Sequence, residues 1–152
     1  MGKLYITCGC PGSGKSTWAQ KKVTEGWSWN SRDKIRFSMI TPEDEYFSKE
    51  DDVYDAFIAS IQNDIDDKIE NIIADASHLT VKGRKMLLDR LSLNGYEIIY
   101  VVFTTPLEVA IERNNLRTGR ALVPESAIRR MYNSFVMPTG NIIKINKDGE
   151  EE

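Results

Sequence analysis

Apolar and polar residues follow one another along the chain in two alternating patterns, one typical of strands and one typical of helices. Short apolar runs predict buried strands, whereas apolar residues that recur every three or four positions predict helices with one buried face. The expected strands are 3–8, 27–33, 71–77, 96–103 and 141–146, and the expected helices are 13–25, 49–69, 80–95, 106–115 and 125–135. This alternation predicts an α/β fold, with a parallel sheet of about four to five strands covered by helices on both faces.

Polar groups gather where three of the expected strands end. Loop 9–16 follows the first strand, Asp33 follows the second, and Asp75 with Ser77 follows the third. The carboxyl ends of parallel strands share one edge of the sheet, and ligands bind at that edge, so we expect these groups to form a common site. We expect strand 3–8 at the centre of the sheet.

The first loop carries the most specific motif of the chain. In "GCPGSGKST" (9–17), Gly9, Gly14, Lys15 and Ser16 fit the Walker A pattern G-x-x-x-x-G-K-[ST], between a strand and a helix. In this motif, backbone N–H groups hold the phosphates of a nucleoside triphosphate, the lysine reaches the β- and γ-phosphates, and the hydroxyl ligates Mg²⁺. The candidate phosphate-binding residues are Gly12, Ser13, Gly14, Lys15, Ser16 and Thr17, and Ser16 is the candidate metal ligand.

The segment "NSRDKIR" (30–36) offers a carboxylate beside an arginine. If a helix begins near Asp33, then Asp33 and Arg36 lie three residues apart on one face of it. A carboxylate next to an arginine stays ionised near pH 7, so Asp33 is a candidate general base for a hydroxyl acceptor. Arg36 can hold an acidic group on that acceptor. The alternative is a helix cap with a surface ion pair.

The segment "RNNLRTGRALVP" (113–124) carries a second group of arginines. Arg113 and Arg117 are four residues apart, and Gly119 and Pro124 bracket a segment that could move. Arginines on a hinged loop can neutralise charge on a phosphoryl group during transfer, so we expect a small lid here. The alternative is a basic helix end that complements the helix dipole.

A third group of polar residues follows the strand 71–77. Asp75 ends an apolar run, which indicates a carboxylate near Mg²⁺, directly or through water. Ser77 and His78 come next, and we interpret His78 as a loop residue rather than as a base.

Composition and charge narrow the class of protein. The 152 residues fit one domain, and the net charge of −3 does not favour a nucleic acid as the partner, although a short local basic patch can suffice for one. Two cysteines, Cys8 and Cys10, build no disulfide framework, and we find no signal peptide or membrane-spanning run, which together favour the cytoplasm. The stretch 42–55 has seven acids against one lysine and is interpreted as solvated, and 147–152 as a frayed acidic tail.

Together, these segments resemble the kinase domain of the phage T4-type polynucleotide 5′-kinases, over about residues 1–137. "GCPGSGKSTWA" (9–19) is similar to that family's phosphate loop and "NSRDKIR" to its acceptor-site segment. "RNNLRTGRALVP" is similar to its lid, and "IRRMY" (128–132) to the helix after the lid. The resemblance implies a P-loop kinase fold in which residues 1–146 form a single kinase domain.

The resemblance also implies a reaction of nucleic acid repair. The γ-phosphate of ATP would pass, with Mg²⁺, to the 5′-hydroxyl end of DNA or RNA, with Asp33 as the general base and Arg36 on the acceptor's phosphate. Arg113 and Arg117 would bind the donor phosphates, with Arg117 the better candidate for stabilising the transition state. The implied catalytic residues are Lys15, Asp33, Arg36 and Arg117, and the implied acceptor-binding residues are Asp33, Arg36, Asp75 and Ser77. The resemblance allows a homo-oligomer.

Three departures from the family's pattern affect these roles. The acidic stretch 42–55 fits poorly with a long nucleic-acid track, so we expect contacts with a polynucleotide acceptor to cover only its last few nucleotides. The family enzyme carries a threonine directly after the aspartate at the strand tip, where this chain has Ala76, so Ser77 is the candidate replacement. Two-domain members continue into a phosphatase with a D-x-D-x-T motif. This sequence has no such motif, so we expect no removal of 3′-phosphates.

The residues leave two alternatives to a polynucleotide kinase. A P-loop kinase of a small acceptor, such as a nucleoside or another metabolite, would use the same layout, and the net charge suits it. A module that senses ATP without transferring phosphate would leave Asp33 and the lid arginines unexplained. Aromatic residues in or near the acceptor half are candidates either for stacking with bases or for core positions: Trp27, Trp29, Tyr46, Phe47 and Tyr54.

Overall fold

The computed structural model describes residues 2–119 and 122–152, and it confirms the five predicted strands and the five predicted helices in their order along the chain. It adds one helix that was not among them, because the expected strand 27–33 ends at Ser31 and a separate helix follows directly. The strands are β1 (Lys3–Cys8), β2 (Ser28–Ser31), β3 (Asn71–Asp75), β4 (Glu97–Phe103) and β5 (Asn141–Ile145). The helices are α1 (Lys15–Thr24), α2 (Arg32–Met39), α3 (Glu50–Asp66), α4 (Val81–Asp89), α5 (Leu107–Asn115) and α6 (Glu125–Ser134). Helix α2 begins directly before Asp33, as the pairing of Asp33 with Arg36 requires.

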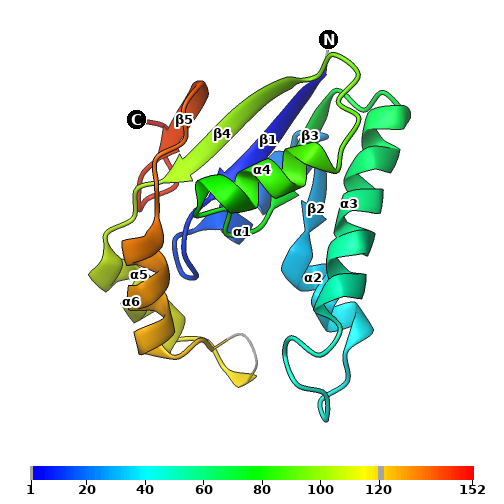
Figure 1. The fold of residues 1–152 in the computed structure, drawn as a ribbon. Coiled ribbons are helices and arrows are strands. Elements are labelled where there is room, and N and C mark those ends of the chain that lie inside the picture. The colour runs from blue at the N-terminus through cyan, green and yellow to red at the C-terminus, as the bar shows by residue number, and fades with distance from the viewer. Residues whose placement is uncertain (1, 120–121) are drawn as a thin grey trace.

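The five strands form one parallel sheet in the order β2-β3-β1-β4-β5, with β1 at its centre (Figure 1). The predicted α/β fold with a parallel sheet is therefore confirmed. Because all five strands run in the same direction, the residues that follow β1, β2 and β3 come together at one edge of the sheet.

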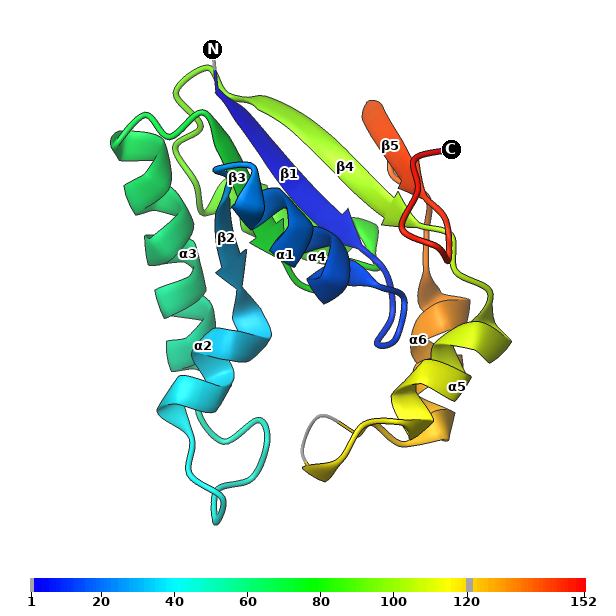
Figure 2. The ribbon, with the colours of Figure 1, turned by 180° about the vertical axis from the view of Figure 1, so that it is seen from behind.

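Helices cover both faces of the sheet, as predicted. Side chains along β1 alternate, so Leu4 faces one side and Tyr5 the other. Leu4 packs with Phe57 of α3 and Leu87 of α4, whereas Tyr5 packs with Trp18 of α1. Figures 1 and 2 show α4 in front of one face and α1 in front of the other. In the described part of the chain, no helix combines the length and the apolar character needed to cross a membrane.

Helix α4 is shorter than its sequence pattern predicts. Thr80 caps it as expected, because its Oγ1 accepts a hydrogen bond from the N–H of Gly83 at 3.0 Å. The helix ends at Asp89 rather than near residue 95. Gln62 of α3 binds the backbone N–H and carbonyl of Ser92, at 2.8 and 3.1 Å. A tertiary contact thus replaces the helical hydrogen bonds that the local pattern would continue.

The expectation that residues 147–152 are frayed is wrong. The N–H of Asn146 donates to the Glu150 carbonyl at 2.9 Å, and the N–H of Glu152 donates to the Lys144 carbonyl at 2.8 Å. The Asn146 side-chain oxygen also accepts from the N–H of Glu150 at 3.0 Å, which stabilises the turn. The segment therefore folds back beside β5. Its acidic composition is typical of a solvated tail, so the sequence alone did not indicate this turn.

Two segments extend beyond the carboxyl edge of the sheet. One is residues 40–49, between α2 and α3, and the other is the described residues 116–119 and 122–124, between α5 and α6. Both views show the two segments on opposite sides of the space below the strand ends (Figures 1 and 2). Residues 120–121 of the expected lid lie outside the described residues. The site between these segments begins with the loop after β1.

Candidate active site

The loop between β1 and α1 forms a cradle of backbone N–H groups. Gly12 and Gly14 have φ values of 83° and 100°, in the left-handed region, which turns successive N–H groups toward one centre. Among the described residues, the N–H groups at positions 12 and 14–17 have no acceptor. Those at 14–17 stand at the start of α1, where N–H groups have no carbonyl partner within the helix. The cradle can therefore bind an anion with its backbone.

Close packing fixes the shape of this loop. A Cβ built on Gly12 would lie 2.3 Å from the carbonyl oxygen of Ala110 in α5, and one built on Gly9 would lie 2.6 Å from the Ser13 hydroxyl oxygen. Position 12 therefore requires glycine, because its neighbour is backbone, whereas a side chain at position 9 would displace the Ser13 hydroxyl. Cys10 packs in the same region, and burial raises the pKa of its thiol, which disfavours a reactive thiolate.

Lys15 folds back over the loop. Its Nζ donates to two loop carbonyl oxygens at 2.9 and 3.0 Å, and the ammonium keeps a third donor for a ligand. Burial lowers the pKa of Lys15 below its usual range, the carboxylates of Asp75 and Asp33 act in the opposite direction, and Arg117 adds to the lowering. Charged residues at or after the ends of β2, β3 and α5 are thus close enough to influence the pKa of this lysine, which follows β1.

The loop fits the triphosphate and the Mg²⁺ that its motif predicts. Its open N–H groups and the third Lys15 proton suit phosphate oxygens. The Ser13 hydroxyl is buried and has no partner among the described residues. Ser16 is exposed in the first turn of α1, where its hydroxyl can ligate Mg²⁺.

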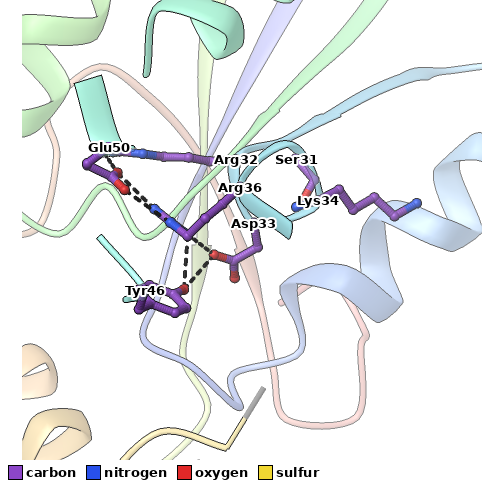
Figure 3. A network of polar contacts seen from close by, with 7 residues as sticks. All are labelled: Ser31, Arg32, Asp33, Lys34, Arg36, Tyr46 and Glu50. Atoms are coloured by element: carbon purple, nitrogen blue, oxygen red, sulfur yellow. Dashed lines mark hydrogen bonds and ion pairs between the residues drawn. The ribbon is translucent and has the colours of Figure 1, made fainter. Parts of the chain in front are cut away.

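Asp33 lies in the first turn of α2 and is held from one side only. The Ser31 hydroxyl accepts from the N–H of Lys34 at 3.2 Å, which caps α2 directly after β2. Asp33 Oδ1 accepts from Arg36 Nη1 and from the Tyr46 hydroxyl, the latter at 2.9 Å (Figure 3). Oδ2 has no partner among the described residues, so this oxygen is available to accept a proton from a hydroxyl.

Arg36 is buried and faces Glu50. Its Nε and Nη2 donate to the two Glu50 oxygens at 3.0 and 2.8 Å, and its Nη1 donates to Asp33 and to the Tyr46 hydroxyl. Four of its five N–H donors are thus used within the protein. In this arrangement Arg36 holds Asp33, and a single Nη2 proton is left for the acceptor phosphate that the resemblance assigns to it.

Sequence reasoning missed Glu50 and the role of Tyr46. Glu50 lies in the acidic stretch that was interpreted as solvated, yet it accepts from both Arg36 and Arg32. Its partner Arg36 is 14 residues away, a spacing that carries no signal in a single sequence. Burial raises the pKa of Tyr46 to about 12, and the charge of Asp33 adds to the rise, so the phenol stays a donor.

Asp75 is buried at the end of β3 and is engaged within the protein. Its Oδ1 accepts from Thr7 Oγ1 at 3.1 Å, and its Oδ2 accepts from Trp29 Nε1 at 2.9 Å. Burial raises its pKa, while the charge of Lys15 and these hydrogen bonds oppose the rise. Asp75 therefore acts on Lys15 of the cradle by its charge, while each of its two oxygens accepts a hydrogen bond within the protein.

The residues after β3 support the phosphate loop from behind. The Ser77 carbonyl accepts from the N–H of Gly9 at 3.0 Å, and His78 Nδ1 bonds the Thr7 carbonyl at 2.8 Å. Burial lowers the pKa of His78 to about 4, so the ring is neutral near pH 7 and Nδ1 is the donor. His78 is therefore a structural loop residue, as interpreted. Arg84 of α4, another residue that the sequence did not single out, donates to the His78 carbonyl at 2.8 Å.

The two lid arginines occupy different positions. Arg113 lies in the last turn of α5 beside the cradle, since a Cβ on Gly14 would lie 3.7 Å from its Nη1. Its Nη2 donates to the carbonyl of Lys147 in the C-terminal turn. Arg117 is exposed after α5 and acts on the pKa of Lys15. Both arginines therefore border the phosphate cradle.

The candidate aromatic residues divide into two groups. Three of them pack against the core clusters of the sheet: Trp27, Trp29 and Tyr54. The other two, Tyr46 and Phe47, contact each other with ring centroids 4.6 Å apart, beside Asp33. Of the five candidates, this second group is the one that lies next to the candidate base.

The family of the chain follows from its sequence as well as from this geometry. A model of the AAA domain family matches residues 4–138, which run from β1 to beyond α6. The chain belongs to the AAA domain family. The matched residues include the phosphate loop, Asp33, the buried Asp75 and both lid arginines.

Comparison with solved structures narrows the family assignment to the P-loop kinases. The chain matches one chain of the Pnkp1/Rnl/Hen1 RNA repair complex with a TM-score of 0.72 and 26% identity, over 88% of this chain and 43% of that one. It thus spans less than half of that relative's length. A sugar kinase from Janibacter sp. HTCC2649 matches with a TM-score of 0.68 and 19% identity, over 99% and 88% of the two chains. A gluconokinase from Sinorhizobium meliloti 1021 matches with a TM-score of 0.61 and 20% identity, over 95% and 82%.

These matches agree with the site. The two sugar kinases share the fold, and the chain is a P-loop kinase with a five-stranded sheet in the order β2-β3-β1-β4-β5. A P-loop kinase domain binds ATP, typically with Mg²⁺, and transfers a phosphoryl group. The resemblance to P-loop kinases is thereby confirmed, and the acceptor is the question that the site residues must answer.

Proposed function

We propose that this P-loop kinase transfers the γ-phosphate of ATP to the 5′-hydroxyl end of DNA or RNA. The observation that carries the proposal is the position of Asp33, with Oδ1 anchored, Oδ2 open, and its charge acting on Lys15. The similarity to a chain of an RNA repair complex supports the choice of acceptor. Residues 1–146 then act as a single kinase domain, with 113–124 as its lid.

Each residue has a defined task in this reaction. Asp33 Oδ2 accepts the proton of the 5′-hydroxyl while O5′ bonds to the γ-phosphorus and the bond from that phosphorus to the bridging oxygen breaks, which releases ADP. Lys15 and the N–H groups of the cradle neutralise the charge of the donor phosphates. Ser16 would hold Mg²⁺, which would neutralise further charge on the donor phosphates. Arg113 and Arg117 bind the donor phosphates from the lid, with Arg117 at the transferring group.

The acidic stretch 42–55 beside the acceptor side favours a second candidate, a kinase of a small acceptor such as a nucleoside or another metabolite. The stretch 42–55 carries seven acids against one lysine, and Arg36 is already paired with Glu50. This side of the site therefore offers few free cations to a phosphodiester chain. In the polynucleotide proposal, contacts accordingly cover only the terminal nucleotides.

Transfer of labelled γ-phosphate from ATP with Mg²⁺ separates the two candidates. The acceptors are a short 5′-hydroxyl oligonucleotide, a nucleoside, a nucleoside 3′-monophosphate, gluconate, and a reaction without acceptor. The proposal predicts label on the oligonucleotide. Lys15→Ala, which removes the ammonium from the phosphate cradle, should abolish this label and so show that the transfer comes from this site. Label confined to a nucleoside, a nucleotide or gluconate would overturn the proposal in favour of the second candidate.

A further inference from the structure

Three aromatic rings stand beside Asp33 on the acceptor side. They are Phe37 of α2 and the adjacent Tyr46 and Phe47, which we name the aromatic cluster. The Tyr46 ring lies between the other two, with its centroid 5.9 Å from that of Phe37 and 4.6 Å from that of Phe47, both in edge-on geometry. Phe47 is 67% exposed and Phe37 is 39% exposed. Apolar rings grouped in this way on a surface mark a binding region more often than single exposed side chains do.

The aromatic cluster is fixed relative to the proposed base. The Tyr46 hydroxyl donates to Asp33 Oδ1 at 2.9 Å and accepts from Arg36 Nη1 at 3.0 Å (Figure 3). The guanidinium carbon of Arg36 lies 4.5 Å from the Tyr46 ring centroid and 5.5 Å from that of Phe47. A group that binds on Phe47 is therefore held at a defined position relative to the open oxygen of Asp33.

The charge around the aromatic cluster selects the chemical group that can bind there. The segment that carries Tyr46 and Phe47 is acidic, with these carboxylates against Lys49: Glu43, Asp44, Glu45, Glu50, Asp51 and Asp52. Phosphates are repelled by such a surface, whereas a neutral nucleobase has a π-face that stacks on an aromatic ring. A sugar acid such as gluconate is an anion without a ring face, so it gains nothing from Phe47.

We infer that the aromatic cluster, with Phe47 as its contact ring, binds the nucleobase of the acceptor's 5′-terminal nucleotide. This inference rests on the proposed function and specifies which part of the acceptor this side of the site holds. Phe47 is the most exposed ring of the aromatic cluster, at 67%, so it is the ring that a base can reach.

The test compares an intact acceptor with one that lacks the base in question. One acceptor is a 5′-hydroxyl oligonucleotide, and the other carries an abasic tetrahydrofuran residue at its 5′ end, which keeps the 5′-hydroxyl. Both are phosphorylated by the wild type, Phe47→Ala, Phe47→Trp and Met86→Ala. Met86 is the matched control, because it is also a large exposed apolar side chain, at 50%, but belongs to α4, which packs on one face of the sheet.

The expected results follow from the loss of one stacking contact. Phe47→Ala should raise the KM for the intact acceptor about tenfold and leave the KM for ATP unchanged. The abasic acceptor should bring a similar rise with the wild type and no further rise with Phe47→Ala, because one contact cannot be lost twice. Phe47→Trp and Met86→Ala should behave like the wild type.

Two outcomes would overturn the inference, and they are distinguishable. If the wild type phosphorylates intact and abasic acceptors equally well, or if Phe47→Ala leaves the KM of the intact acceptor unchanged, the proposed function survives and the stacking site is wrong. If the wild type labels no oligonucleotide and labels gluconate or another small acceptor, the proposed function fails and the inference fails with it.

Discussion

Arg36 and Glu50 form a two-bond ion pair between α2 and α3, in which Nε and Nη2 reach the two carboxylate oxygens at 3.0 and 2.8 Å. Arg36 is only 4% exposed, so its charge depends on this partner. Through Nη1 the same guanidinium holds Oδ1 of Asp33. Glu50 therefore positions the proposed base through Arg36.

Replacing Glu50 by alanine should lower both stability and turnover. The buried Arg36 charge loses its carboxylate, which costs about 2 kcal/mol or more of unfolding free energy, and Asp33 loses its fixed orientation. The KM for ATP should not change, since the phosphate cradle is untouched. Urea unfolding and acceptor kinetics measure these effects.

The control for this variant lies on the same helix. Asp55 pairs with Arg90 at 3.0 Å, but both side chains are exposed, so Asp55→Ala should change stability by about 0.5 kcal/mol or less. A Glu50→Ala protein with the stability and kcat of the wild type would show that the ion pair does not position Asp33.

Gly12→Ala should disrupt the phosphate cradle. Gly12 has a φ of 83°, and a Cβ there would lie 2.3 Å from the Ala110 carbonyl oxygen, so α5 and the loop must move apart. Gly26→Ala is the matched control, because Gly26 has a φ of 91° but nothing within 4 Å of its Cβ position. The control should cost about 1–2 kcal/mol from backbone strain alone and keep ATP binding. Equal ATP affinity in the two variants would contradict this account of the loop.

His78 should make stability depend on pH. Burial lowers its pKa from the ordinary 6.5 to about 4, so between these values the unfolded chain binds a proton that the folded chain does not. The contribution of His78 is therefore complete above pH 6.5 and is lost as the pH falls toward 4. His78→Asn, at a residue with a φ of 43° that asparagine tolerates, should flatten this part of the curve.

Urea unfolding of both proteins across this pH window measures the effect. Asp75 acts in the opposite direction, because burial raises its pKa and the folded state holds its proton more tightly. That contribution is present in both proteins and cancels in their difference. Equal slopes for the wild type and His78→Asn would mean that His78 is protonated alike in the folded and unfolded chains.

The features that the sequence predicts best are those whose residues are close together in the chain. The phosphate loop occupies consecutive residues, and its glycines are needed by local backbone geometry, so the cradle follows from the motif alone. Asp33 and Arg36 are three residues apart, so their contact follows as soon as Ser31 caps α2. The order of the strands and of the five predicted helices follows from periodicity for the same reason, whereas α2 has too few residues to show a clear period.

The features that the sequence did not predict depend on contacts between distant residues. Glu50 meets Arg36 only because α3 packs beside α2, and the acids around Glu50 made it look solvated. Gln62 ends α4 early by binding Ser92, which lies 30 residues away. Trp29, a candidate for stacking, instead donates to Asp75 within the core. In each case the local sequence allows two structures or roles, and a contact with a residue distant in the chain determines which one is formed.

The most direct test of the central claim is single-turnover transfer from ATP to a 5′-hydroxyl oligonucleotide by Asp33→Asn. Asparagine keeps an oxygen for Arg36 and Tyr46 but cannot take up the proton, so ATP binding should match the wild type. The account predicts that the rate of transfer falls by about 10²–10⁴-fold. Transfer by Asp33→Asn at the wild-type rate would contradict it and remove Asp33 as the base.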